Sequence, residues 1–217
     1  MTDLITQLVA IARDRGASIV GVTGGIAAGK STVAAALADA LGWLTVSTDG
    51  FIRADAGDRK GYADSYDAAA IAAFVDAIRA DGKATAPRYS HLHYDVVGYD
   101  EIASNTLVLD GLHLGHPALG LRDRIDLLVH LDAPTDTLSE WYLCRFQQLR
   151  TRAKEDPTAF LYPYKDLDPE VLDAMAMQVW RDLNAVVIAE EVRPAESAAD
   201  VVVRLDADHG FAELILR

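Results

Sequence analysis

The sequence predicts an α/β fold of three layers, in which helices cover both faces of a mostly parallel sheet. Short apolar runs alternate with longer stretches whose apolar residues recur every three or four positions, as in strands joined by helices. A glycine-rich turn stands between the first apolar run and the helical stretch that follows it. No linker rich in Pro, Gly or Ser divides the chain, so we expect residues 1–217 to form a single domain.

The first half of the chain is expected to begin with an amphipathic helix over residues 1–15, since its apolar residues share one face. The elements that follow are short apolar strands and Ala-rich or apolar-striped helices: strands over 18–23 and 43–47, and helices over 30–41 and 66–80. Gly42 ends the first of these helices. Residues 86–97 contain Pro87 and several aromatic residues, so this segment is expected to be extended or a loop.

The second half supplies the remaining strands of a parallel five-stranded core. These strands are mostly apolar and are expected over 106–109, 125–131 and 201–205. A long helix is expected from Pro134 to about Arg152, followed by a proline-containing loop and a helix over 169–191.

The composition is that of a folded globular protein, because 51% of the 217 residues are hydrophobic and 24% are charged. The single cysteine, Cys144, excludes an intrachain disulfide and is typical of a reducing compartment. The net charge of −13 argues against a surface that binds nucleic acid or anionic lipid. The sequence has neither a membrane-length apolar stretch nor a signal-peptide pattern. We therefore expect a cytoplasmic protein with neither nucleic acid nor membrane as a partner.

The turn after the first strand matches the phosphate-binding pattern G-x-x-x-x-G-K-[ST] at every fixed position. Glycines let its backbone amides point at phosphate oxygens, and the helix that follows adds its positive end. Lys30 can reach the β- and γ-phosphates, and Ser31 can ligate Mg²⁺. The pattern therefore predicts a P-loop NTPase-type sandwich that binds ATP and Mg²⁺. The residues expected to bind the nucleotide are Gly24, Gly25, Ile26, Ala27, Ala28, Gly29, Lys30, Ser31 and Thr32.

Two aspartates follow predicted strands and are expected beside the phosphates. Asp110 ends the strand over 106–109 and is predicted to hold Mg²⁺ with Ser31. Asp49 follows the strand over 43–47, where it can accept a proton from an attacking hydroxyl group. Each could instead be an ordinary turn residue.

Several further segments, in the same order, resemble those of bacterial type I pantothenate kinases, a family similar in fold to uridine kinases and phosphoribulokinase. The most specific are Tyr89-Ser90-His91-Leu92-His93-Tyr94-Asp95-Val96 and Trp141-Tyr142-Leu143-Cys144-Arg145-Phe146. The others include Thr48-Asp49-Gly50-Phe51, Asp64-Ser65-Tyr66-Asp67, Trp180-Arg181-Asp182-Leu183-Asn184 and Asp208-His209. The resemblance covers the chain from about residue 19 onward and implies phosphorylation of the primary hydroxyl of pantothenate by MgATP, a step of coenzyme A biosynthesis.

The resemblance also implies an acceptor site. Asp49 would contact and activate the hydroxyl group. His91, Tyr142 and Asn184 would bind the body of the acceptor, with Tyr89 beside them. His, Tyr and Asn suit a ligand that carries a carboxylate, an amide and hydroxyl groups.

On the phosphate side, the resemblance places Arg145 and Arg150 in a helical lid over residues 141–166 that closes over the phosphates. Arg145 would contact the acceptor as well, and would join Lys30 and the proton-accepting aspartate as a catalytic residue, since an arginine there stabilises the phosphoryl group in transit. His209 would lie near the adenine. The resemblance further suggests a homodimer.

Three alternatives stay open at this point. The acceptor can be uridine, cytidine or a sugar, as in other kinases of the superfamily. The chain can be a regulatory module that binds a nucleotide without catalysis, although such a module would not need Asp49. Individual residues also have plain structural interpretations: Tyr142 can pack in the core, Arg145 can reach solvent, and His91 can be a structural histidine.

Overall fold

The computed structural model describes residues 2–208 and 210–217. Its centre is a six-stranded sheet in the order β2-β5-β1-β6-β7-β8. The strands are β1 (Ile19–Gly24), β2 (Leu44–Ser47), β5 (Leu107–Asp110), β6 (Leu127–Asp132), β7 (Val201–Leu205) and β8 (Phe211–Leu216). All neighbours pair in parallel except β7 and β8, which are antiparallel. The mostly parallel sheet is confirmed.

The five predicted strands form the parallel part of the sheet, so the parallel five-stranded core is confirmed. The sequence did not predict β8, which adds an antiparallel strand at the edge of the sheet. The predicted strands β1 and β5 are buried along their whole length, and such strands are continuous apolar runs. In β8 the residues are half-buried or exposed, so its sequence lacks that signal.

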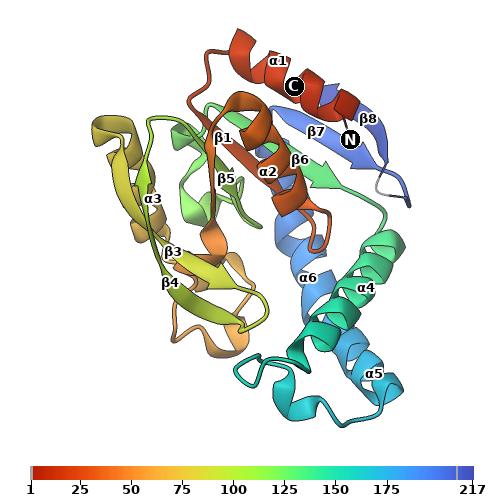
Figure 1. Cartoon of the computed structure of the whole chain (residues 1–217). Helices are drawn as coiled ribbons and strands as arrows, with labels where there is room; N and C mark the ends of the chain where they lie inside the picture. The colour runs from red at the N-terminus through yellow and green to blue at the C-terminus, as the bar shows by residue number, and fades with distance from the viewer. Residues whose placement is uncertain (1, 209) are drawn as a thin grey trace.

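Helices cover both faces of the sheet, as the three-layer fold requires (Figure 1). One apolar core joins the sheet to α1 (Thr2–Asp14) and α2 (Lys30–Leu41), and a second joins the opposite face to α3 (Ala68–Asp81). The helix predicted over 66–80 begins at Ala68, two residues later than expected. Asp67 caps it, because its side chain accepts a hydrogen bond from the amide of Ala70 at 2.9 Å.

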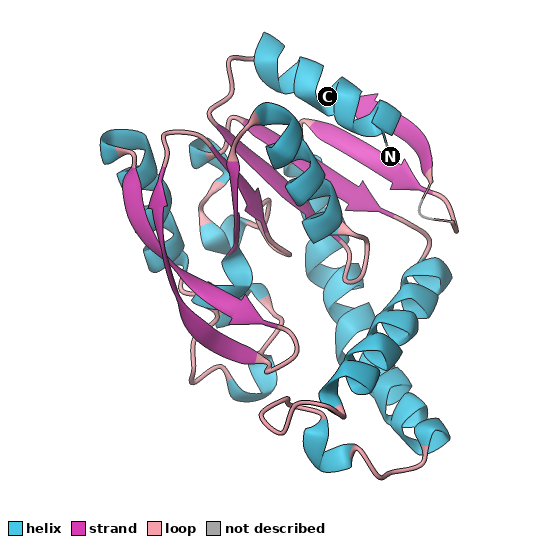
Figure 2. Cartoon of the chain, viewed as in Figure 1, coloured by secondary structure: helices cyan, strands magenta, loops and turns pink. Residues whose placement is uncertain are grey.

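The segment expected to be extended or a loop over 86–97 belongs to a separate antiparallel hairpin of β3 (Lys83–Ser90) and β4 (Asp95–Ala103) (Figure 2). In β4, exposed residues alternate with half-buried ones, so the apolar run of a buried strand is missing. Pro87 is tolerated because β3 has only one partner strand.

After β6 the chain forms α4 (Thr135–Ala153) and then α5 (Pro169–Val179), which extend together beyond the sheet (Figure 1). The helix predicted over 169–191 is a helical run interrupted by two π-helical segments: it continues through Trp180–Asn184, α6 (Ala185–Val187), Ile188–Val192 and α7 (Arg193–Ala195). None of the helices in the described part of the chain has the length and apolar character needed to span a bilayer.

Candidate active site

The phosphate-binding turn has the backbone geometry that its glycines permit. Gly24 has a φ of 136°, and a Cβ there would collide with the carbonyl oxygen of Leu131. Gly29, with a φ of 80°, stands directly before α2 in the left-handed region. Ala27 is also left-handed, with a φ of 65°. Successive amides in such conformations form a concavity that fits phosphate oxygens.

The charged groups around this turn fit a metal-bound triphosphate. Lys30 Nζ donates to the carbonyl oxygen of Gly25 at 2.9 Å. Burial lowers the pKa of Lys30, although Asp110 and Asp49 act in the opposite direction. The side chains of Ser31 and Asp110 are hydrogen-bonded to each other, and burial raises the pKa of Asp110.

These residues could hold Mg²⁺ in the way this ion prefers. The described residues contain no group of three or more His, Cys, Asp or Glu side chains that could hold a metal. Mg²⁺ needs no such cage, because one or two protein oxygens, water and substrate phosphates complete its octahedron. The hydroxyl of Ser31 and the buried carboxylate of Asp110 supply the protein oxygens at this position.

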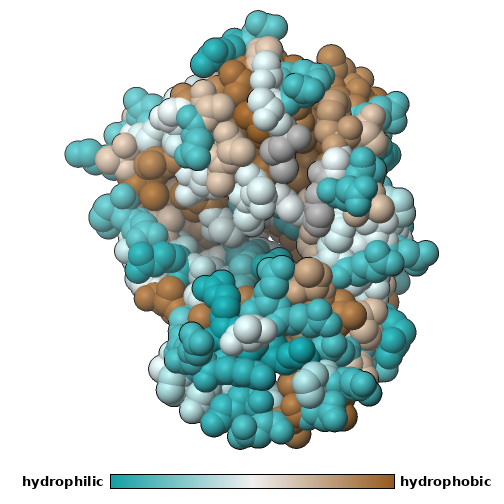
Figure 3. All heavy atoms as spheres, turned by 45° about the vertical axis from the view of Figure 1, so that its right-hand side comes forward, coloured by the Kyte–Doolittle hydropathy of each residue, from teal (hydrophilic) through white to brown (hydrophobic). Residues whose placement is uncertain are grey.

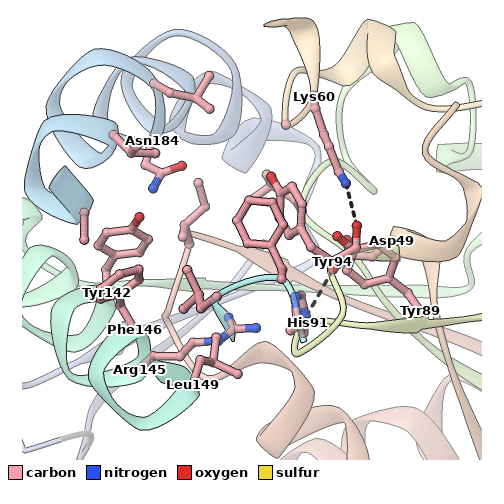
Figure 4. Close-up of a pocket in the computed structure, with 18 of the residues that line it drawn as sticks. Asp49, Lys60, Tyr89, His91, Tyr94, Tyr142, Arg145, Phe146, Leu149 and Asn184 are labelled. Carbon is pink, nitrogen blue, oxygen red and sulfur yellow. Dashed lines mark hydrogen bonds and ion pairs between the residues drawn. The ribbon is translucent and has the colours of Figure 1, made fainter. Parts of the chain in front are cut away.

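Asp49 lies at the same edge of the sheet, in the 3₁₀ turn Thr48–Phe51 that follows β2. Its Oδ1 accepts a hydrogen bond from the hydroxyl of Tyr66 at 3.2 Å. Its Oδ2 lies 3.5 Å from Nε2 of His91, and its side chain is 23% exposed (Figure 4). The expected juxtaposition of Asp49, Asp110 and Lys30 agrees with the strand order, in which β5 lies between β2 and β1.

A cavity of about 470 Å³ opens between Asp49, the hairpin and the α4–α5 pair. The face shown in Figure 3 is hollowed between the lower lobe and the body of the molecule. The acceptor residues expected from the sequence all line the cavity: Asp49, Tyr89, His91, Tyr142, Arg145 and Asn184. The structure therefore brings together side chains that are 135 positions apart (184 − 49).

Sequence comparison places the chain among known enzymes. It is 35% identical to the pantothenate kinase of Clavibacter michiganensis, with 92% of this chain and 70% of that protein aligned. It is 36% identical to the pantothenate kinase of Streptomyces coelicolor, with 92% of this chain and 69% of that protein aligned. The chain belongs to the pantothenate kinase family. No protein-family model matches it.

Solved structures agree on the fold at low sequence identity. A candidate fructose transport system kinase from Silicibacter has a TM-score of 0.66 at 18% identity, covering 90% of this chain and 95% of that one. A possible uridine kinase from Bacillus stearothermophilus has a TM-score of 0.51 at 20% identity, covering 77% and 96%. Phosphoribulokinase from Rhodobacter has a TM-score of 0.55 at 13% identity, covering 89% and 73%. The P-loop kinase fold of this pantothenate kinase family member is confirmed.

Aromatic and amide groups of this family member form the wall of the cavity farthest from Asp49 (Figure 4). Tyr142 packs against Trp180, with ring centroids 5.4 Å apart, and its hydroxyl is hydrogen-bonded to the side chain of Asn184. Asn184 ends the first π-helical segment. Such segments recur at functional sites because they turn side chains away from the α-helical register.

His91 and Arg145 line the part of the cavity between Asp49 and Tyr142 (Figure 4). Burial and the charge of Arg145 lower the pKa of His91 to about 4, so its imidazole is neutral at pH 7. The ring packs edge-on against Tyr89 with centroids 5.2 Å apart. Within the described part of the chain, no hydrogen bond or ion pair joins Arg145 to another side chain, so its guanidinium is available to a ligand.

The last three predicted nucleotide residues are Arg150, Thr32 and His209. Arg150 forms an ion pair with Asp173 at 2.7 Å and donates to a carbonyl oxygen of α5, so it ties α4 to α5 rather than lining the cavity. Thr32 lines a smaller cavity of about 230 Å³ beside Gly29 and Phe211. His209 lies outside the described residues. Their roles stay predictions.

Sequence reasoning missed other residues of the cavity. Lys60 reaches it from the loop after β2, lies 3.5 Å from the ring centroid of Tyr94 and donates to the carbonyl oxygen of that residue at 3.0 Å. Tyr66 was noticed only as part of a family-like segment, with no role attached. Much of the remaining wall is apolar and comes from α4, α5, the loop between them and the π-helical segment after α5: Phe146, Leu149, Phe160, Leu161, Leu172, Met175, Val179 and Leu183. No local pattern separates such residues from core positions.

Proposed function

We propose that the protein transfers the γ-phosphate of ATP to a primary hydroxyl group of a small molecule, and that this acceptor is pantothenate. The observation that carries the proposal is the position of Asp49 between the phosphate-binding turn and a cavity lined by every expected acceptor side chain. A nucleotide-dependent regulatory module would need neither the carboxylate nor the cavity. The names of the relatives supply the choice of acceptor.

In the proposed reaction, the acceptor oxygen bonds to the γ-phosphorus while the bond from that phosphorus to the β-phosphate oxygen breaks. Asp49 orients the hydroxyl group and takes its proton. Lys30 and the loop amides hold the phosphates, and Arg145 stabilises the negative charge of the phosphoryl group in transit. Ser31 and Asp110 would hold Mg²⁺, which supplies further charge neutralisation at the β- and γ-phosphates when bound.

The lid and the assembly state belong to the same proposal. Residues 141–166 comprise α4 from residue 141 onward and most of the loop toward α5. We expect this segment to close over the phosphates while the rest of the single domain keeps its structure. The family resemblance supports a homodimer in the cytoplasm. Light scattering of the purified protein measures the assembly state directly.

An acceptor panel tests the function. Purified protein is assayed for ADP release with pantothenate, with uridine and with fructose, each against a reaction without acceptor. We expect ADP release that depends on pantothenate and is much weaker with the other two. Stimulation by uridine or fructose alone would overturn the acceptor assignment, and tight ATP binding without stimulation by any acceptor would favour the regulatory module.

A further inference from the structure

Tyr66 is built into the framework that carries Asp49. Its backbone pairs with Ile52 in an isolated antiparallel bridge, and the amide of the next residue, Asp67, donates to the carbonyl oxygen of Phe51 at 2.8 Å. The turn with Asp49 and the segment with Tyr66 are therefore fastened to each other, although the two residues lie 17 positions apart.

The ring of Tyr66 is enclosed, with only 4% of the residue exposed. The imidazole of His113 packs edge-on against it, with centroids 5.6 Å apart. His113 is itself fixed by a hydrogen bond of its Nε2 with the carbonyl oxygen of Gly61 at 2.8 Å. A ring held in this way keeps its hydroxyl group in one place.

The hydroxyl group of Tyr66 gives the two carboxylate oxygens of Asp49 different surroundings. It donates to Oδ1 at 3.2 Å, whereas Oδ2 faces His91, another residue of the cavity, across 3.5 Å. Burial, together with the charge of Asp49, raises the pKa of Tyr66 well above its usual value. The phenol therefore stays protonated, and stays a donor, throughout the neutral range.

We propose that Tyr66 is a positioning residue that holds Oδ1 of Asp49 and so leaves Oδ2 in place to receive the proton of the acceptor hydroxyl. The inference rests on the proposed function, which assigns the proton to Asp49. It adds a residue of the same cavity that acts on the reaction through the carboxylate. A fixed carboxylate meets the hydroxyl group in a productive orientation, and a loss of that orientation lowers the rate more than the binding.

The test is Tyr66→Phe, which removes the hydroxyl group and keeps the ring. We expect kcat to fall about tenfold, since one hydrogen bond to a charged group is lost, while the KM values for pantothenate and ATP stay within about twofold. Tyr99→Phe is the matched control, because Tyr99 is 70% exposed and outside the cavity; it should change nothing.

A double-mutant cycle with Asp49→Asn separates positioning from a structural role. If Tyr66 acts through Asp49, adding Tyr66→Phe to Asp49→Asn costs little further activity. Additive losses, or a loss of kcat that comes with a lowered Tm and raised KM values, would overturn the proposal. An unchanged kcat in Tyr66→Phe would do so as well.

A measurement that does not depend on turnover can test the role of Tyr66 separately from the kinase assignment. Carboxyl-¹³C NMR of aspartate-labelled protein, with Asp49→Asn used to assign the signal, reports the surroundings of the Asp49 carboxyl group directly. We expect its chemical shift at pH 7 to change in Tyr66→Phe, and an unchanged chemical shift would refute the hydrogen bond. Wild-type protein that turns over no acceptor would refute the kinase assignment, whatever the NMR signal shows.

Discussion

The two halves of the candidate site are built in different ways. The phosphate half consists of nine consecutive residues, 24–32, whose backbone conformation would supply most of the contacts to the phosphates. The acceptor half is assembled from side chains on the turn after β2, the β3–β4 hairpin, α4 and a π-helical segment. A backbone cradle recognises any triphosphate, whereas a cavity of side chains can change its acceptor by a few substitutions. This difference explains how kinases of one fold serve different acceptors.

The two halves also differ in how they are held. The phosphate turn connects β1 to α2 inside the main core. On the acceptor side, the hairpin tip and the α4–α5 loop meet through a few contacts: His93 Nε2 lies 3.0 Å from the carboxylate of Asp156, and the amide of Phe160 donates to the carbonyl oxygen of Leu92 at 2.9 Å. The rings of Tyr94 and Phe160 pack beside them, 4.9 Å apart. Such sparse contacts suit a region that must admit an acceptor.

The largest effect is expected from a substitution of Asp49, the residue that connects the acceptor half to the phosphate half. Asp49→Asn should lower kcat by about a thousandfold, because the amide cannot take the proton, while ATP binding stays unchanged. Turnover at several pH values and ATP binding by calorimetry measure the two effects. Asp55→Asn, at a side chain 85% exposed nearby, serves as the control. Turnover of Asp49→Asn at the wild-type rate would remove the proton-accepting role.

Arg145 faces both halves, since its charge acts on Lys30 and on His91. Arg145→Ala should lower kcat by about a hundredfold through lost stabilisation of the phosphoryl group, and Arg145→Lys should recover part of the loss. Arg152→Ala, at an exposed position of the same helix, should leave kcat unchanged. Equal losses in both alanine variants would indicate a damaged helix instead.

A smaller effect should be confined to the acceptor half. Tyr142→Phe removes the hydroxyl group that bonds with Asn184 and should raise the KM for pantothenate about tenfold. The KM for ATP in the same variant is the internal control. Parallel increases in both KM values would contradict the separation of the two halves.

The same contrast explains what the sequence can predict. The phosphate turn and the parallel strands have local signals, since glycine spacing and apolar runs lie within a few residues. The β3–β4 hairpin and β8 lack continuous apolar runs because they are half-exposed, and the π-helical segments have no compositional mark. The acceptor residues were located only through resemblance to a family. The contact of Tyr66 with Asp49 depends on a tertiary bridge that no local pattern encodes.

The smallest expected effect concerns the free energy of unfolding and a buried histidine on β6, the strand next to β1 and its phosphate-binding turn. His130, on β6 beside Thr23, is 1% exposed, and neither of its ring nitrogens has a hydrogen-bond partner. Burial lowers its pKa to about 4, against about 6.5 in an unfolded chain. As the pH falls below 6.5, the unfolded chain takes up this proton and the folded chain does not, so the folded state loses stability.

Between pH 7 and pH 5 this one histidine should cost about 2 kcal/mol of unfolding free energy. His130→Leu should therefore lose less stability over that interval than the wild type, by a similar amount, in urea titrations at the two pH values. His113 and His91 titrate in the same direction, so some acid sensitivity should persist. An equal loss in His130→Leu and the wild type would mean that His130 is already protonated or hydrated in the folded protein. Acceptor KM values at pH 7 should be unaffected, because His130 lies outside the acceptor cavity.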